Sequence, residues 1–161
     1  MPRSETPRRV RPTSAHWHKQ YLLRMPDELV SRCALESHLA LVGGCVEGGV
    51  KDALIKLIRL TYLSFFLWEA GYNGEPSDFL EAERALDTAV NRAAESGLWQ
   101  LNEDECAVVK RVVCEHDEQL HAVSMRAYLE ATKRLELLLR RPQTRSPIQE
   151  HFRGETAPAR T

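Results

Sequence analysis

Apolar residues recur at spacings of three and four along most of the chain, in five stretches separated by glycine, proline or polar connections. This spacing places apolar side chains on one face of an α-helix. Sustained two-residue alternation, which would indicate strands, is essentially absent. The pattern predicts an all-α fold: a single-domain bundle of about five helices with disordered basic termini.

The first helix is predicted to begin near Pro26 and to end at Gly43 and Gly44. Proline suits the first turn of a helix, and Asp27 and Glu28 suit the positive end of its dipole. Its apolar positions cover more than half of the circumference: Val30, Cys33, Ala34, Leu35, Leu39, Leu41 and Val42. The glycine-rich stretch that follows is predicted to be a turn.

The second helix, about Val50–Ala70, is predicted to be the central one. Its first half carries a polar stripe, whereas the stretch Tyr62–Trp68 leaves no polar face. A helix that is apolar all round is a buried helix. Five of the eleven aromatic residues fall between Tyr62 and Tyr72, so we place the core there.

Three further helices follow. Ser77 is predicted to cap the third helix, which ends at Gly97. Asn102 and Glu105 predict a capping box at the start of the fourth, and the fifth starts near Ser124 and ends at Arg140 and Arg141. The apolar seams are Phe79, Ala82, Leu86, Ala89 or Val90, and Ala93, then Cys106, Val109, Val113, His116 and Leu120, then Met125, Tyr128, Thr132, Leu135 and Leu139.

Composition divides the chain into three parts. Residues 1–16 are predicted to be a disordered basic arm, residues 17–142 the bundle, and residues 143–161 a disordered tail. The net charge of −1 hides an asymmetry, because residues 1–24 carry six basic and one acidic side chain, whereas residues 25–132 carry nine basic and nineteen acidic ones. Residues 133–161 carry seven basic and three acidic side chains.

Two basic ends flanking an acidic body indicate arms that could meet phosphate groups. The sequence therefore predicts DNA contacts from both ends, and the same charge also suits ordinary soluble tails. The predicted nucleic-acid-binding residues are Arg8, Arg9, Arg11, Lys19, Arg24, Lys133, Arg134, Arg140, Arg141 and Arg145.

No membrane partner is expected, because the longest uncharged hydrophobic run, Leu60–Trp68, has nine residues and a span needs about 20. Four cysteines without a paired spacing argue against a secreted disulfide scaffold. Cys33 and Cys106, which lie on apolar seams, are expected to behave as small hydrophobic residues. We therefore predict a cytoplasmic protein.

No catalytic residue, metal site, cofactor or small-molecule substrate is predicted. His116 and His121 lie five residues apart, on different faces of a helix, and Glu118 with His121 gives one Glu-x-x-His pair where di-iron bundles need two. His116 is expected to be a hydrogen-bonded core histidine. Gly44 and Gly49 have the spacing of a phosphate loop, but Val50 interrupts the motif before Lys51.

Several motifs give the chain a resemblance to small proteobacterial helical proteins that are often labelled Fis-like transcriptional regulators. These motifs are Trp17-His18, the run Leu60–Tyr72, Gly97-Leu98-Trp99, the run His116–Leu120 and Arg145-Ser146-Pro147. The resemblance implies DNA binding by a C-terminal helix-turn-helix, yet one long helix and a tail follow Ser124. The segment around Arg24–Leu29 also resembles the strand-to-helix entry of ribbon–helix–helix dimers, an alternative that would require a strand over Trp17–Met25.

Two functions remain open from the sequence. The first is a small non-enzymatic bacterial regulator that associates with DNA through its basic ends. The alternative is a helical protein–protein interaction adaptor, as a homodimer or with another partner, that uses an apolar patch on the incompletely covered central helix. The salt dependence of binding distinguishes the two functions, because DNA binding weakens steeply as the salt concentration rises, whereas an apolar contact persists.

Overall fold

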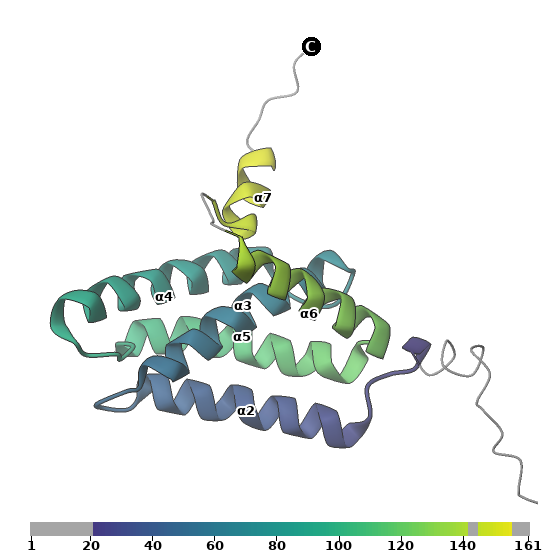
Figure 1. The fold of residues 1–161 in the computed structure, drawn as a ribbon, viewed down its shortest axis with the longest axis horizontal. Coiled ribbons are helices and arrows are strands. Elements are labelled where there is room, and N and C mark those ends of the chain that lie inside the picture. The colour runs from purple at the N-terminus through teal and green to yellow at the C-terminus, as the bar shows by residue number, and fades with distance from the viewer. Residues whose placement is uncertain (1–20, 142–144, 156–161) are drawn as a thin grey trace, which may run out of the picture.

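The computed structural model describes residues 21–141 and 145–155. Within them the chain forms the helices α2 (Asp27–Cys45), α3 (Lys51–Glu69), α4 (Pro76–Ser96), α5 (Glu103–Ala122), α6 (Met125–Arg140) and α7 (Pro147–Glu155) (Figure 1). The extended pairing in this part of the chain is one isolated antiparallel bridge between Arg24 and Ser124. The all-α prediction is confirmed, whereas the predicted number of helices is one too low.

Helix α3 is the central helix, as predicted. It crosses the middle of the bundle and packs against α2, α4, α5 and α6 (Figure 1). Leu54, Leu57, Phe65 and Leu67 of α3 have no exposed surface. Ile58, Tyr62, Leu63 and Trp68 of α3 are half-buried and Ile55 is 42% exposed, so the neighbouring helices leave part of the α3 surface uncovered.

The ends of three helices follow the sequence. Gly97 ends α4 in the left-handed conformation, with φ of 75°. The Asn102 side chain accepts from the Glu105 N–H, and the Glu105 carboxylate accepts from the Asn102 N–H, each at 2.8 Å. Ser124 caps α6 by accepting from the Ala127 N–H. These polar caps satisfy backbone groups that a helix end leaves free.

Two other predicted ends are wrong. Helix α2 continues through Gly43 and Gly44 to Cys45. Gly44 is buried where α2 packs closely against α3. A Cβ at Gly44 would lie 3.1 Å from Leu57 Cδ1, so this glycine permits close packing instead of ending the helix. Helix α4 begins at Pro76, which suits a first helical position, so Ser77 already lies inside the helix that it was predicted to cap.

The predicted seam of α4 is buried, with Ala89 in the position left open between Ala89 and Val90. The seam of α5 is buried except at Cys106, and the seam of α6 has an exception at Leu139. Leu139 of α6 is 45% exposed, and the adjacent Leu138 is the half-buried residue that contacts the core. Cys106 is half-buried and does not act as a free apolar side chain. Its sulfur forms a disulfide with Cys45, whose Cα lies 5.9 Å away.

The disulfide corrects the interpretation of Cys106 as a small hydrophobic residue. The sequence offered no signal for the bond, because Cys45 and Cys106 are 61 residues apart and their proximity depends on how α2 packs against α5. Disulfides persist mainly in oxidising compartments. The bond therefore weighs against the cytoplasmic location, which stays a prediction.

Helix α7 lies in the segment predicted to be a disordered tail. It packs against α4, and its Ile148 has no exposed surface. His151 of α7 stands edge-on to Trp68, with ring centroids 5.0 Å apart. These contacts show that part of the C-terminal segment belongs to the bundle. The burial of Ile148 stabilises the docked position of α7.

Candidate functional site

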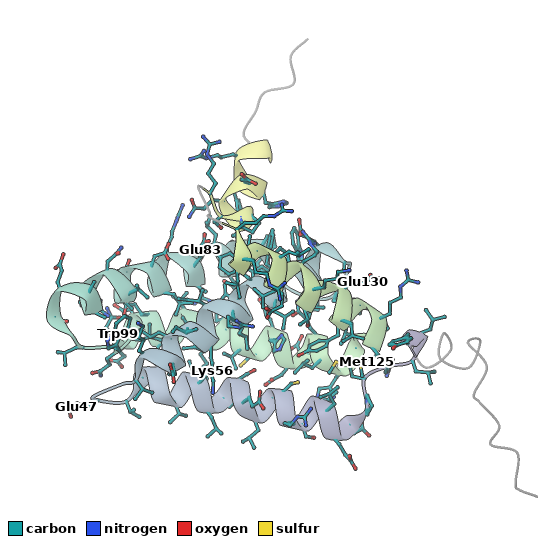
Figure 2. All side chains as sticks on the ribbon, viewed as in Figure 1. Glu47, Lys56, Glu83, Trp99, Met125 and Glu130 are labelled. Carbon is teal, nitrogen blue, oxygen red and sulfur yellow. A yellow bond between two sulfur atoms is a disulfide. The ribbon has the colours of Figure 1, made fainter. Side chains whose placement is uncertain are left out.

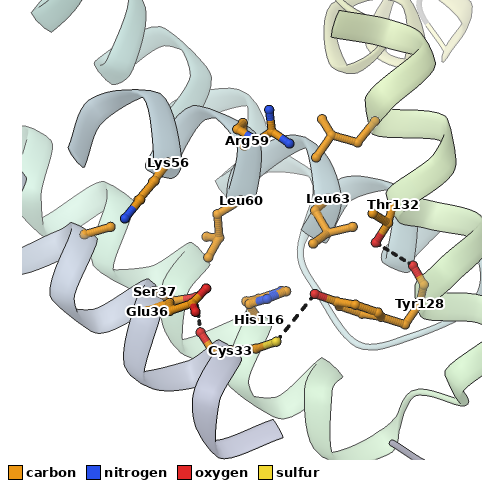
Figure 3. Close-up of a pocket in the computed structure, with 12 residues that line it drawn as sticks. Cys33, Glu36, Ser37, Lys56, Arg59, Leu60, Leu63, His116, Tyr128 and Thr132 are labelled. Atoms are coloured by element: carbon orange, nitrogen blue, oxygen red, sulfur yellow. Dashed lines mark hydrogen bonds between the residues drawn. The ribbon is translucent and has the colours of Figure 1, made fainter. Parts of the chain in front are cut away.

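A pocket of about 340 Å³ opens between α2, α3 and α6, and one residue of α5 also lines it (Figure 3). We call it the inter-helix pocket. Leu60 and Leu63 of α3 and Leu135 of α6 supply its apolar surface. The sequence placed Leu135 on a seam, and the pocket forms where the α6 seam stands away from α2.

The polar wall of the pocket comes from α2 and α6. The Tyr128 hydroxyl lies 3.6 Å from Cys33 Sγ, and the Thr132 hydroxyl donates to the Tyr128 carbonyl at 2.8 Å (Figure 3). Burial raises the pKa of Tyr128 well above its ordinary value, and the neighbouring thiol adds to the effect. Tyr128 is therefore a neutral hydrogen-bonding group at physiological pH.

His116 of α5 also lines the pocket and is 2% exposed. Its Nδ1 lies 3.0 Å from the Ser64 hydroxyl of α3, which confirms the prediction of a hydrogen-bonded core histidine. Burial lowers the pKa of His116 to about 4, although the charge of Asp117 opposes the shift. The imidazole is accordingly neutral at pH 7.

Charged side chains lie around the same pocket. The Arg59 guanidinium donates to Glu136 at 2.6 Å, outside the lining residues. Lys56 forms no ion pair or hydrogen bond within the described part of the chain, and Glu36 is the one carboxylate in the lining. The lining therefore carries two cations and one anion.

A second surface lies on the outer face of α2. Leu35, Leu39, Val42 and Val46 are 60%, 61%, 57% and 48% exposed. Their spacing of four, three and four residues places them in one row, which we call the α2 stripe. Side chains project from this outer edge of α2 away from the bundle, and none of the named helices covers it (Figure 2).

The sequence held a signal for the α2 stripe that its interpretation missed. Apolar positions cover more than half of the circumference of α2, whereas the buried face accounts for Val30 and Ala40 and the half-buried flanks for Cys33, Ala34 and Leu41. The surplus apolar positions form the stripe. Large exposed apolar surfaces on soluble proteins are typical of interaction sites.

The described members of the predicted nucleic-acid-binding set do not gather at one place. Arg8, Arg9, Arg11 and Lys19 lie outside the described residues. The backbone of Arg24 forms a β-bridge with Ser124, the N-cap of α6, whereas Arg141 is the C-cap of α6. The length of α6, about 24 Å, therefore separates Arg24 from Arg141.

The remaining basic residues are exposed, yet several lie beside acidic ones. Lys133 and Arg140 are exposed on α6, and Arg134 binds Glu69 at 2.8 Å while lying 4.2 Å above the Phe66 ring. Arg141 and Arg145 line a hollow together with Glu83 and Asp87. The described basic side chains therefore do not form one cationic surface.

Metal and thiol chemistry has little geometric support in the described part of the chain. Within that part, no group of three or more histidine, cysteine, aspartate or glutamate side chains is placed to hold a metal ion. Cys45 is bonded to Cys106, which leaves Cys33 half-buried and Cys114 exposed as free thiols. No helix among the described residues is long and apolar enough to cross a membrane.

Comparisons of the chain with protein-family models, with curated proteins and with solved structures found no match. The resemblance to Fis-like regulators stays a prediction.

Proposed function

We propose that the chain is a non-enzymatic helical interaction module that pairs with a second copy of itself through the α2 stripe. The observation that carries the proposal is a continuous row of four aliphatic side chains, each between 48% and 61% exposed. Single exposed leucines are ordinary on protein surfaces, whereas a continuous apolar row is typical of an interface.

The spacing within the stripe suits a partner helix. Steps of four, three and four residues are those of the seam along which two helices pack side by side. In an antiparallel pair, Leu39 of each copy faces Val42 of the other, and Leu35 faces Val46. Such a pair is closed by two-fold symmetry, since the same patch serves both copies.

Charge supports the antiparallel arrangement. Arg32 lies on α2, three residues before Leu35, and Glu47 follows Val46 in the turn after the helix, where it points away from the bundle (Figure 2). Neither residue forms an ion pair within the described part of the chain. Antiparallel pairing brings Arg32 beside Glu47 of the second copy, near the negative end of that copy's α2 dipole.

Sedimentation velocity of single-residue variants tests the stripe. Leu39→Glu introduces a charge near the centre of the seam in both copies, so we expect at least a hundredfold weaker dimer. Leu137→Glu is the matched control, because Leu137 is also exposed, at 45%, but lies on α6. Equal effects of the two substitutions would contradict the proposal.

Charge reversal tests the orientation. Arg32→Glu and Glu47→Arg should each weaken the dimer several-fold, since each places like charges across the interface. The double variant restores opposite charges and should recover most of the loss. A double variant that is weaker than either single one would show that these residues do not meet.

DNA binding through the basic ends stays a prediction. If roughly five phosphates are contacted, the logarithm of the DNA affinity should fall against the logarithm of the salt concentration with a slope of about −4.5. The affinity of the proposed dimer should not fall with salt in this way, because apolar contacts persist at high salt concentration. Titration of the full chain onto a mixed-sequence duplex at two salt concentrations therefore tests the two functions separately.

A further inference from the structure

The inter-helix pocket is an open cleft large enough to hold a small molecule. Its volume is about 340 Å³. Ligand sites begin at roughly this volume and are mostly apolar with a few placed polar groups. Leu60, Leu63 and Leu135 provide the apolar surface here.

The hydrogen-bonding groups of the pocket are neutral. Tyr128 holds its proton because burial raises its pKa, and the buried His116 is uncharged at pH 7. Thr132 already donates within its own helix, which leaves its oxygen as an acceptor. These groups suit an uncharged part of a ligand, and none of them carries a positive charge that would bind an anion.

Two cationic side chains of α3 line the pocket, and they lie on either side of Leu60 (Figure 3). Lys56 has no described partner, and a guanidinium has five N–H donors, of which Arg59 uses one on Glu136. An ammonium without a partner beside an apolar surface is suited to bind a carboxylate. Glu36 disfavours a large negative charge, so a single carboxylate fits the balance.

We propose that the inter-helix pocket binds a small monocarboxylate with an apolar body. The carboxylate binds the Lys56 ammonium, and the apolar body packs against Leu60, Leu63 and Leu135. This site is on the face of α2 opposite the α2 stripe, so it is independent of the proposed dimer.

Isothermal titration of the full-length protein with 3-phenylpropionate tests the proposal. A ligand of this size typically binds in the millimolar to sub-millimolar range. The matched probes are 3-phenylpropan-1-ol, which lacks the charge, and 3-phenylpropylamine, which reverses it. We expect the carboxylate to bind at least tenfold more tightly than either. Equal binding of the three probes, preference for the amine, or no binding of any would overturn the proposal.

Two substitutions locate the site. Lys56→Gln should weaken 3-phenylpropionate at least tenfold and leave the alcohol unchanged, whereas the exposed Lys110→Gln on α5 should alter neither. Leu63→Trp fills the pocket and should abolish binding, with Leu129→Trp on α6 as its control. Circular dichroism confirms that each variant is folded. Binding that survives Leu63→Trp in a folded protein would place the ligand elsewhere and overturn the assignment.

Discussion

Cys45, in the last turn of α2, is joined by a disulfide to Cys106, in the first turn of α5. The bond closes a loop of 61 residues that contains all of α3 and α4. It therefore links the helix that carries the stripe to the helix that supplies His116 to the pocket.

Removing this disulfide should destabilise the bundle. The entropy of a closed loop of this length predicts that Cys45→Ser with Cys106→Ser lowers the free energy of unfolding by about 4 kcal/mol. Urea denaturation with and without reductant measures the loss. Cys114→Ser, at an exposed free thiol, is the control and should change stability by less than about 0.5 kcal/mol. An oxidised protein no more stable than the reduced one would contradict the expectation.

Glu105 should be the most sensitive acidic residue for stability. Its carboxylate binds Arg92 through both oxygens, at 2.9 and 2.7 Å, and also accepts from the Asn102 N–H. Burial acts to raise the pKa of Glu105, but the hydrogen bonds from Arg92 and Asn102 outweigh it, so the pKa lies below its ordinary value. Stability from this group is present above pH 4.5 and is lost as the pH falls through the folded-state pKa.

Glu105→Ala should lower the free energy of unfolding by about 2–3 kcal/mol at pH 7, because it leaves Arg92 unpaired and removes half of the capping box. Glu103→Ala, an exposed residue in the same helical turn, should cost less than about 1 kcal/mol. Thermal or urea unfolding of both variants at pH 7 gives the comparison. Similar losses would show that the Arg92 contact contributes little.

His116 and Glu115 should affect the pH dependence of stability in opposite directions. Burial lowers the pKa of His116 to about 4, so its contribution falls as the pH drops from 6.5 toward 4, by up to about 1.4 kcal/mol per pH unit. Partial burial, with the charge of Asp78 adding to it, raises the pKa of Glu115 to about 7. The contribution of Glu115 therefore falls as the pH rises from 4.5 through 7.

Between pH 4.5 and 6.5 these two slopes oppose each other in the native chain. Glu115→Gln removes one of them, so its free energy of unfolding should rise more steeply with pH than that of the native protein. His116→Gln should rise less steeply. Urea denaturation at several pH values, taken as the difference from the native protein, isolates each group. Parallel curves for all three proteins would contradict both assignments.

Gly49 should tolerate no side chain. A Cβ there would collide with the Trp99 carbonyl oxygen and lie 3.0 Å from the Gly43 carbonyl oxygen, both of which are backbone atoms. Gly49→Ala should therefore cost more than about 1 kcal/mol, because the α2–α3 turn must move. Gly154→Ala, where a Cβ has open space, should cause no loss. Urea denaturation of the two variants tests this close contact.

Much of the fold follows from local rules that the sequence displays. The central place of α3 was predictable because Tyr62–Trp68 has no polar face, and the capping box at Asn102 because it needs residues three positions apart. Features that depend on distant contacts were not predictable. The Cys45–Cys106 bond and the burial of Ile148 both require knowing which helices become neighbours.

The candidate surfaces divide in the same way. The stripe was visible as surplus apolar positions on α2, yet only the packing of α2 on α3 and α5 shows which of them face outward. The inter-helix pocket had no sequence signal. Tyr128 and Thr132 lie on a regular seam of α6, and only the tertiary arrangement leaves a space beside them.

The mass of the full-length native chain in solution tests the central claim most directly. Light scattering after size exclusion, over roughly 1–200 µM protein in 0.1 and 0.5 M sodium chloride, reports mass against concentration. Pairing through the α2 stripe predicts a mass that rises toward twice 18.4 kDa with concentration and does not fall at the higher salt. A mass of 18.4 kDa at every concentration and both salts would contradict the account.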